Sequence, residues 1–362
     1  MDVLVPFPFM QEVKRILFVV NPISGTSQKR LILKQIEKHL DLTRFEYEVV
    51  NTEYMGHATE IARDAAHRGV DIVCAIGGDG TVNETARSLV HTSTALAIIP
   101  CGSGNGLARH LHIPLDPIRA VKLINEGVPR KMDYGLINQH PFFCTCGVGF
   151  DAFISQKFAE AGKRGPRAYI ENVLRNALKY NPETYEIEVE DEHEKTAQYK
   201  AVIIACANAS QYGNNAFIAP QASVRDGLMD VTIIEPFTVI EAPQLAFQLF
   251  SGTIDQSSRI KSFRCKNLRI NRSKPGVIHY DGDPIESGAQ VDVSIVSLGL
   301  SCICPQDEGV MDVGESIQSQ LLENFYNMYL RSEELFENNA LRNGRIIKLN
   351  KDIINKLKPH GK

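Results

Sequence analysis

The chain has 362 residues, of which 43% are hydrophobic and 23% are charged, and this composition excludes a largely disordered protein. Its length predicts about two domains, because a single hydrophobic core stops growing near ~250–300 residues. The 39 basic and 43 acidic residues leave a net charge of −4. That balance argues against a strongly basic nucleic-acid-binding protein, so we expect no nucleic-acid partner.

Targeting and cysteine patterns indicate the compartment. No apolar run approaches the ~18 residues of a membrane-spanning helix, and the N-terminal segment lacks the basic start of a signal peptide. The eight cysteines lie mostly in apolar, strand-like runs without C-x₂-C zinc spacing: Cys74, Cys101, Cys144, Cys146, Cys206, Cys265, Cys302 and Cys304. We interpret them as buried free thiols, which predicts a cytoplasmic protein.

The first 130 residues alternate strand and helix patterns. Strand patterns cover 15–21, 45–52, 71–78 and 95–100, and helix patterns cover 28–40, 57–69 and 82–89. The run over 71–78 is almost wholly apolar, as expected for a strand that is covered on both faces. This order predicts a parallel sheet with helices on both faces, and therefore an N-terminal α/β domain over residues 1–132.

After residue 132 the pattern changes to short strands that are separated by turn residues. The strand patterns cover 140–150, 185–191, 198–209, 228–236, 268–273, 277–284 and 291–299. Helix patterns are expected only around 152–180 and 238–250. We expect an antiparallel β-sandwich domain over 133–300, followed by a return segment and helical tail over 301–362 that packs on the first domain.

Three glycine-containing segments follow strands of the first domain. They are "NPISG" from Asn21, "GGDGTVNE" from Gly77 and "PCGSGNGLARHL" from Pro100. Because the carboxyl ends of parallel strands form the ligand crevice of an open α/β sheet, these loops are expected to converge. Glycine lets a backbone approach a ligand closely, and helix N-termini favour phosphate. Each loop alone is compatible with a simple turn, whereas the three together indicate a polyphosphate ligand.

The common nucleotide motifs are missing. The sequence has no G-x-x-x-x-G-K-[ST], no G-x-G-x-x-G after its first strand, and no H-R-D and D-F-G pair. These absences argue against a P-loop NTPase, a dinucleotide-binding Rossmann unit and a protein kinase, respectively.

The three loops resemble the signature loops of the diacylglycerol kinase catalytic-domain family, which includes bacterial lipid kinases and the sphingosine kinases. "GVGFDA" from Gly147, "VRDGLMDV" from Val224 and "HYDGDP" from His279 resemble its second-domain motifs in the same order. The resemblance implies an ATP-dependent lipid kinase, with ATP in the cleft between an α/β domain and a β-sandwich. Diacylglycerol, a sphingoid base, ceramide and a polyprenol are all open as the acceptor.

The resemblance also implies the residues of the ATP site. Transferred by motif, they are Asn21, Pro22, Ser24, Gly25, Thr52, Gly77, Gly78, Asp79, Gly80, Thr81, Asn83, Glu84, Gly102, Ser103, Gly104, Asn105 and Arg109. Relatives often carry a lysine after "NPxSG", where this chain has Thr26. The alternatives for that phosphate-binding charge are Lys29, Arg30, Lys163, Arg164 and Arg167.

A magnesium site and a catalytic base are implied in the second domain. The match of "DGLMDV" implies that Mg²⁺ binds the side chain of Asp226 and the carbonyls of Ser223 and Leu228, and oxygen ligands suit this cation. "YDGDP" matches a D-G-E motif with Asp283 in place of glutamate, so Asp281 or Asp283 is the candidate base. Asp79 is a rival base.

The same acidic residues sit in segments that also predict turns, since Asp-Gly is a strong turn dipeptide. Two other functions are open: a NAD kinase, which shares "GGDG" but predicts neither second-domain motif, and a catalytically silent lipid-binding relative, which predicts loss of the acidic residues. Residues 341–362 have a basic, amphipathic helical pattern. That helix either contacts an anionic membrane or packs on the protein. Pairing of exposed sheet edges would give a homodimer.

Overall fold

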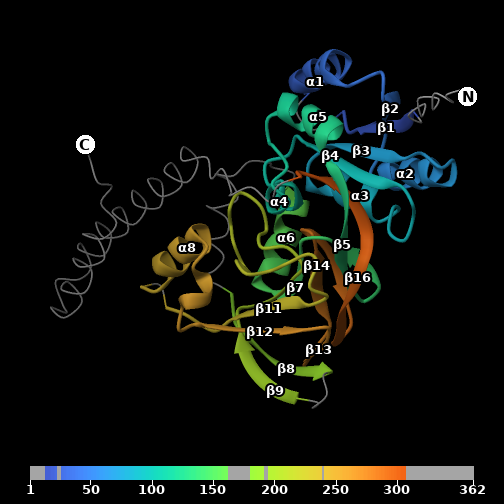
Figure 1. Ribbon diagram of the computed structural model, residues 1–362. Coiled ribbons are helices and arrows are strands. Elements are labelled where there is room, and N and C mark those ends of the chain that lie inside the picture. The colour runs from blue at the N-terminus through green and yellow to red at the C-terminus, as the bar shows by residue number, and fades with distance from the viewer. Residues whose placement is uncertain (1–12, 23–25, 162–179, 191–194, 239, 307–362) are drawn as a thin grey trace, which may run out of the picture.

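The computed structural model describes residues 13–22, 26–161, 180–190, 195–238 and 240–306 (Figure 1). The predictions for the basic tail over 341–362, and for Lys163, Arg164 and Arg167, lie outside these residues. Within them, no helix has both the length and the apolar character needed to cross a membrane. None of the eight cysteines, all of which lie in the described residues, forms a disulfide bond, and all but Cys101 are buried, which agrees with the interpretation as buried thiols.

The first domain is an α/β layer built on a parallel sheet. Its strands are β1 (Lys14–Val20), β2 (Phe45–Asn51), β3 (Ile72–Gly77) and β4 (Ala95–Pro100), in the order β2-β1-β3-β4. Its helices are α1 (Thr26–His39), α2 (His57–His67), α3 (Asp79–Ala86), α4 (Gly106–His110) and α5 (Pro117–Glu126). Strand β1 shows why both faces are covered. Leu17 packs in the cluster that contains Ala62 of α2, whereas Phe18 packs in the cluster that contains Ile36 of α1.

The second domain consists of two antiparallel layers. One sheet has the order β12-β11-β10-β7-β14-β15, with bounds Ile260–Cys265, Met229–Ile234, Ile203–Ala207, Thr145–Gly149, Gly276–Tyr280 and Asp283–Ser287. The other contains β5 (Val128–Ile137), β6 (His140–Phe142), β8 (Glu183–Glu190), β9 (Lys195–Ala201), β13 (Asn267–Arg272) and β16 (Gln290–Cys304). Alternating apolar residues of both layers form one core, in which Cys146 and Val148 of β7 are buried with Ile270 of β13. The predicted α/β plus antiparallel architecture is therefore confirmed.

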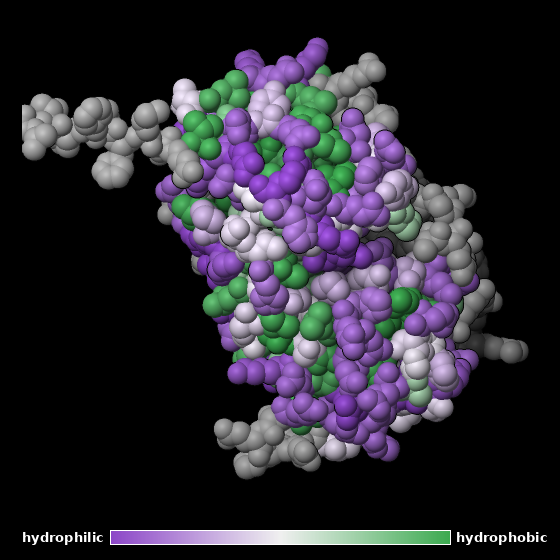
Figure 2. Space-filling model, turned by 90° about the vertical axis from the view of Figure 1, so that its right-hand side faces the viewer, coloured by the Kyte–Doolittle hydropathy of each residue, from purple (hydrophilic) through white to green (hydrophobic). Residues whose placement is uncertain are grey.

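Helices of the second domain lie outside this core. They are α6 (Phe150–Ala161), α8 (Ala242–Ser251) and the short 3₁₀ turn η1 (Ile254–Gln256). Figure 1 shows α8 at the outer side of the second domain, far from the parallel sheet. On the face drawn in Figure 2, apolar surface forms separate patches among hydrophilic side chains.

Strand β16 connects the two domains. Its first half pairs with β13 and β5, and near its end Cys302 pairs in parallel with Leu96 of β4. The parallel sheet of the first domain and the layer of the second domain that contains β16 thus form one continuous ten-stranded sheet. This continuity holds the carboxyl edge of the parallel strands against the second domain.

Several elements differ from the sequence patterns. The third helix begins at Asp79, inside the glycine loop, whereas the pattern predicted its start near residue 82. Helix α5 was missed although it has a clear start signal, since the Asp116 side chain accepts the Arg119 N–H and Pro117 follows. Strands β5 and β12 were missed because their polar and charged residues interrupt the apolar pattern.

Candidate active site

Two of the glycine loops touch each other directly. Strands β3 and β4 are neighbours, and Cys101 N–H donates to the Gly77 carbonyl at 2.7 Å. A Cβ added to Gly102 would lie 2.6 Å from the Cα of Gly78. Only glycine allows this backbone approach, so both loops turn at the same edge of the sheet.

Asp79 joins the second glycine loop to the third. Its Oδ2 accepts the Asn105 N–H at 2.8 Å, and its Oδ1 accepts the Gly106 N–H at 2.6 Å. Burial raises the pKa of the Asp79 carboxyl, and the two main-chain donors act in the opposite direction. The side chain of Asn105 then closes the third loop on itself, with bonds to both the N–H and the carbonyl of Gly102.

The first glycine loop also contacts the second one, through Asn21. Asn21 Nδ2 donates to Thr81 Oγ1 at 3.2 Å, and Thr52, which is buried, donates its N–H to the Val20 carbonyl at 2.8 Å. Glu84 accepts the Gly56 N–H at 2.9 Å. The predicted residues Asn21, Thr52, Thr81 and Glu84 therefore belong to the same edge. Pro22 is exposed, whereas Ser24 and Gly25 lie outside the described residues.

Open space borders this group of loops at two predicted positions. A Cβ added to Gly80 would meet no atom within 4 Å, and Ser103 is exposed. A third position, Gly104, is close-packed instead, since a Cβ there would lie 2.7 Å from Asp79 Oδ2.

Arg109 connects the third loop with the second domain. Its Nε donates to the Gly104 carbonyl at 3.0 Å, and its Nη1 donates to Asn215 Oδ1 at 3.2 Å. The Asn214 N–H donates to the same Gly104 carbonyl at 3.1 Å. Arg109 therefore holds the third loop in place and brings a positive charge to it.

The acidic hairpin of the second domain meets helix α3. Asp281 and Gly282 form the turn between β14 and β15, both with positive φ (47° and 88°), as expected for an Asp-Gly hairpin. The Asp281 carboxylate accepts bonds from the main-chain N–H groups of Phe143 (2.8 Å), Cys144 (2.8 Å) and Thr145 (3.1 Å), and from Asn83 Nδ2 (2.7 Å). Burial raises its pKa, and these four donors oppose the rise. The residue thus anchors the hairpin to both domains.

Asp283 differs from the other two predicted catalytic carboxylates because its side chain is exposed. Partial desolvation and then the charge of Asp281 raise the pKa of its carboxyl, whereas Arg87 lowers it. Asp79 and Asp281 are each engaged by several protein donors. Asp283 is therefore the carboxylate among the three that an incoming hydroxyl group reaches most directly.

The predicted metal loop is held by a buried residue that the sequence analysis missed. Asp133, which has no exposed surface, accepts the N–H groups of Gly227 (2.8 Å) and Leu298 (2.7 Å). Its position between Met132 and Tyr134, both buried in β5, was the available signal. Asp226 itself is exposed, and its Oδ1 accepts the Leu228 N–H at 3.1 Å.

The donor atoms at this loop are of the kind that Mg²⁺ prefers. The carboxylate of Asp226 is exposed, and hard oxygen ligands suit the ion. The described residues contain no group of three or more His, Cys, Asp or Glu side chains placed to hold a metal. Arg264 Nη1 lies 3.8 Å from Asp226 Oδ2, so a guanidinium already shares the carboxylate.

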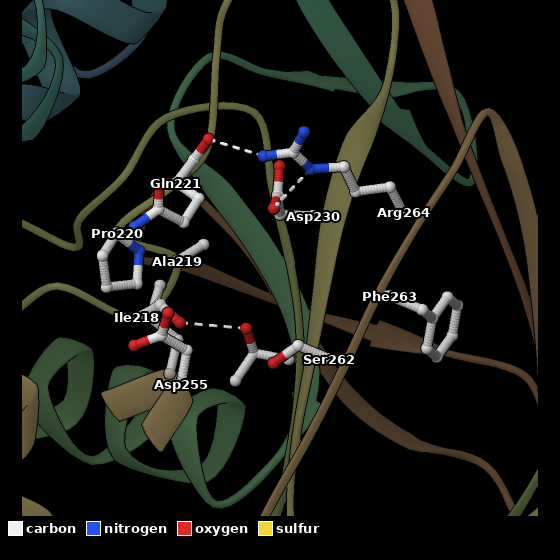
Figure 3. A pocket seen from close by; sticks show the side chains of 10 residues that line it. Ile218, Ala219, Pro220, Gln221, Asp230, Asp255, Ser262, Phe263 and Arg264 are labelled. Carbon is white, nitrogen blue, oxygen red and sulfur yellow. Dashed lines mark hydrogen bonds and ion pairs between the residues drawn. The ribbon is translucent and has the colours of Figure 1, made fainter. Parts of the chain in front are cut away.

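A separate cavity of about 220 Å³ lies in the second domain (Figure 3). Residues 218–221, β11, β12 and η1 line it, and Arg264 donates to Asp230 and to the Gln221 carbonyl at its rim. None of the predicted ATP-site or catalytic residues lines this cavity.

The fold places the glycine loops at the carboxyl edge of the parallel sheet, and the acidic hairpin of the second domain contacts helix α3 there. The profile of the diacylglycerol kinase catalytic domain matches residues 15–137. The profile described as the YegS C-terminal NAD kinase beta sandwich-like domain matches residues 144–300. Residues 15–137 and 144–300 therefore match the two domains of a diacylglycerol kinase-type protein, and the resemblance seen in the motifs is confirmed.

Individual proteins show the same relationship. The chain is 27% identical to the diacylglycerol kinase of Bacillus subtilis (strain 168) over 275 residues, covering 75% of this chain and 90% of the relative. It is 32% identical over 201 residues to a Chromohalobacter salexigens protein named "Probable lipid kinase YegS-like", and this match covers 54% of this chain and 64% of that relative. A crystal structure of a diacylglycerol kinase from Bacillus anthracis str. Sterne superposes with a TM-score of 0.63 at 19% identity, covering 81% of this chain and 97% of that one. This structural likeness supports the fold.

Proposed function

We infer that the chain is an ATP-dependent lipid kinase, which transfers the γ-phosphoryl group of ATP to a hydroxyl group of a lipid such as diacylglycerol or a sphingoid base. The observation that carries this function is the bond from Asn83, in the second glycine loop's helix, to Asp281 of the acidic hairpin at 2.7 Å. This bond brings together the loops that we expect to bind phosphate and the hairpin that we expect to face the lipid hydroxyl group. The family and the lipid kinases among its relatives support the same reaction.

In this proposal ATP lies along the edge that the glycine loops form. Its phosphates face the main chain around Gly78–Thr81 and Gly102–Asn105, where open space borders Gly80 and Ser103. Main-chain N–H groups at the start of α3 offer donors and a favourable helix dipole to phosphate. Asn21 and Thr52 lie along the remainder of the nucleotide, and Arg109 adds positive charge.

Asp283 is the proposed proton acceptor. A general base must lie within hydrogen-bond reach of the attacking hydroxyl, and its pKa works best when it is raised toward the operating pH. Asp283 combines exposure with a raised pKa. Asp281 holds the hairpin in place and Asp79 holds the glycine loops together, because the oxygens of both side chains already accept protein N–H groups.

Mg²⁺ is proposed at Asp226, with the carbonyls of Ser223 and Leu228. When bound, this cation would supply positive charge that stabilises the acidic loop. Asp133 fixes the loop's main chain through Gly227 whether or not the ion is present.

Acceptor, location and assembly stay predictions. A lipid acceptor requires contact with a membrane surface, which agrees with a cytoplasmic protein that binds membranes peripherally. Homodimer formation through a sheet edge also stays a prediction. The NAD kinase alternative is disfavoured by the match of residues 15–137 to the diacylglycerol kinase domain. A silent relative is disfavoured because Asp79, Asp226, Asp281 and Asp283 are retained in ordered, contacted loops.

The test is ³²P transfer from ATP to mixed lipid vesicles and, in parallel, to NAD. We expect a labelled lipid with the wild type, no labelled NAD, and a loss of about 10²–10⁴-fold in Asp283→Asn, the usual contribution of a general base. Glu286→Gln, an exposed change on the same strand, is the matched control and is expected to keep activity. Labelled NAD without labelled lipid would contradict the proposed function.

A further inference from the structure

Arg87 lies at the boundary between the two domains, between helix α3 and the acidic hairpin. It forms the C-terminal cap of helix α3, four residues after Asn83. Its Nε donates to Asn83 Oδ1 at 3.1 Å, and its Nη2 donates to the same oxygen. Since Asn83 Nδ2 donates to Asp281 at 2.7 Å, the contacts form a chain from Arg87 through Asn83 to the hairpin.

The orientation of the Asn83 amide depends on this chain. An asparagine amide presents a carbonyl oxygen on one side and an NH₂ group on the other. The guanidinium is only a donor, so it holds the oxygen on its own side and leaves the NH₂ group for the carboxylate of Asp281. Without Arg87, the Asn83 carbonyl oxygen loses its donors while the NH₂ group keeps its acceptors on Asp281 and Pro141, so the amide is held from one side only.

Arg87 also reaches the second domain directly. Its guanidinium carbon lies 6.0 Å from the centre of the Tyr280 ring, which stacks on His140 at 5.1 Å. Tyr280 and Asp283 are paired across the β14–β15 hairpin. The positive charge is therefore placed beside the strand pair that carries the exposed carboxylate.

The other charged groups around Asp283 are mostly acidic. Asp281 and Glu84 raise the pKa of its carboxyl, whereas Arg87 and, more weakly, His279 lower it. Among the described residues, the remaining titratable groups on elements packed against the hairpin are Glu286 on β15, Asp151 and Lys157 on α6, Cys146 on β7 and His140 on β6. Asp151 accepts from His279 at 3.0 Å, and Lys157 Nζ lies over the Phe153 ring at 5.6 Å.

We propose that Arg87 is a positioning residue for the hairpin that carries Asp283: it holds the Asn83 amide against Asp281 and places its positive charge beside the β14–β15 strand pair. The assignment of Asp283 as base rests on the proposed function, whereas the effect of Arg87 on the Asp283 carboxylate can be measured in the protein without substrate. An opposite charge at close range lowers a carboxyl pKa by about 1–3 units. Its removal is therefore expected to raise the pKa of Asp283 by about one unit.

The experiment compares wild type with Arg87→Gln and Arg87→Lys, and uses Arg63→Gln, an exposed arginine on α2, as the matched control. Carboxyl ¹³C NMR, with Asp283 assigned from Asp283→Asn, reads the titration without any turnover. We expect its midpoint to rise by about one unit in Arg87→Gln and to stay near the wild-type value in Arg87→Lys and Arg63→Gln. An unchanged midpoint in Arg87→Gln would overturn the proposal.

The pH dependence of kcat/KM for lipid phosphorylation gives a second, separate readout. In Arg87→Gln the acid limb of this profile is expected to move upward by about one pH unit, so that kcat/KM falls about tenfold at pH values below the limb. In Arg87→Lys the limb is expected to lie near its wild-type position. An equal loss at every pH in both variants would show a merely structural role and contradict the proposal. If wild type phosphorylates no lipid while the NMR midpoint shifts as expected, the proposed function fails and the role of Arg87 stands.

Discussion

Replacement of Asp281 by asparagine separates an anchoring role from a catalytic one. The wild-type carboxylate accepts four bonds, three from main-chain N–H groups and one from Asn83, at 2.7–3.1 Å. Each oxygen receives two of these donors. In Asp281→Asn one oxygen becomes an NH₂ group, so two donors lose their acceptor and face another donor.

The expected cost follows from these lost bonds. Hydrogen bonds to charged groups contribute about 1.5–3 kcal/mol each, so the loss of two is expected to lower the free energy of unfolding by about 3–6 kcal/mol. Asp283→Asn changes the same chemical group two residues away at an exposed position. It is the matched control, and a surface change of this kind costs at most about 0.5 kcal/mol.

Equilibrium urea denaturation of wild type and both variants measures the difference, with stability taken from the transition midpoint and slope. Lipid phosphorylation of the folded fraction is measured in the same samples. The account predicts an unstable Asp281→Asn and a stable but inactive Asp283→Asn. Asp281→Asn as stable as wild type would refute the reasoning about the anchor.

Three further predictions test separate parts of the site. In Gly102→Ala the new Cβ would lie 2.6 Å from the Gly78 Cα, so the two loops must separate; we expect at least about tenfold weaker binding of a fluorescent ATP analogue, with Gly288→Ala, where space is open, as the control that keeps affinity. Burial lowers the pKa of His110 to about 4 from its ordinary 6.5. The neutral imidazole is therefore compatible with full stability of the folded state above pH ~6.5, and that stability is lost as pH falls toward ~4. We expect the free energy of unfolding to drop by about 3 kcal/mol over that window, and by less in His110→Asn. Because the raised pKa of Asp283 places proton uptake above the ordinary aspartate range, kcat/KM should fall with decreasing pH in an acid limb above pH ~4; a flat profile down to pH 4 would contradict its assignment as base.

Much of the first domain could be predicted because its strands and helices have strong, simple periodicity. The strand over Ala95–Pro100 agrees with its pattern at both ends. Convergence of the glycine loops also followed from the rule that parallel strands carry ligands at their carboxyl ends. What the pattern could not give is that Gly78 and Gly102 touch, since contact between backbones leaves no trace in periodicity.

The roles of the acidic residues could not be separated from sequence. Asp281 and Asp283 are two residues apart in one motif, yet one accepts four protein donors and the other is exposed, because the turn directs them differently. Asp133 and Arg87 escaped detection because their importance arises from partners that are distant in sequence, such as Gly227 and Tyr280. Long-range contacts of this kind decide function and are visible only in the fold.

The most direct test of the central claim is the pH-dependent transfer of ³²P from ATP to lipid vesicles by wild type and by Asp283→Asn, with Glu286→Gln as control. The account predicts a labelled phospholipid with wild type and the control, and a loss of about 10²–10⁴-fold in Asp283→Asn at unchanged stability. Full lipid phosphorylation by Asp283→Asn would contradict the assignment of the base, and no lipid labelling by wild type would contradict the function itself.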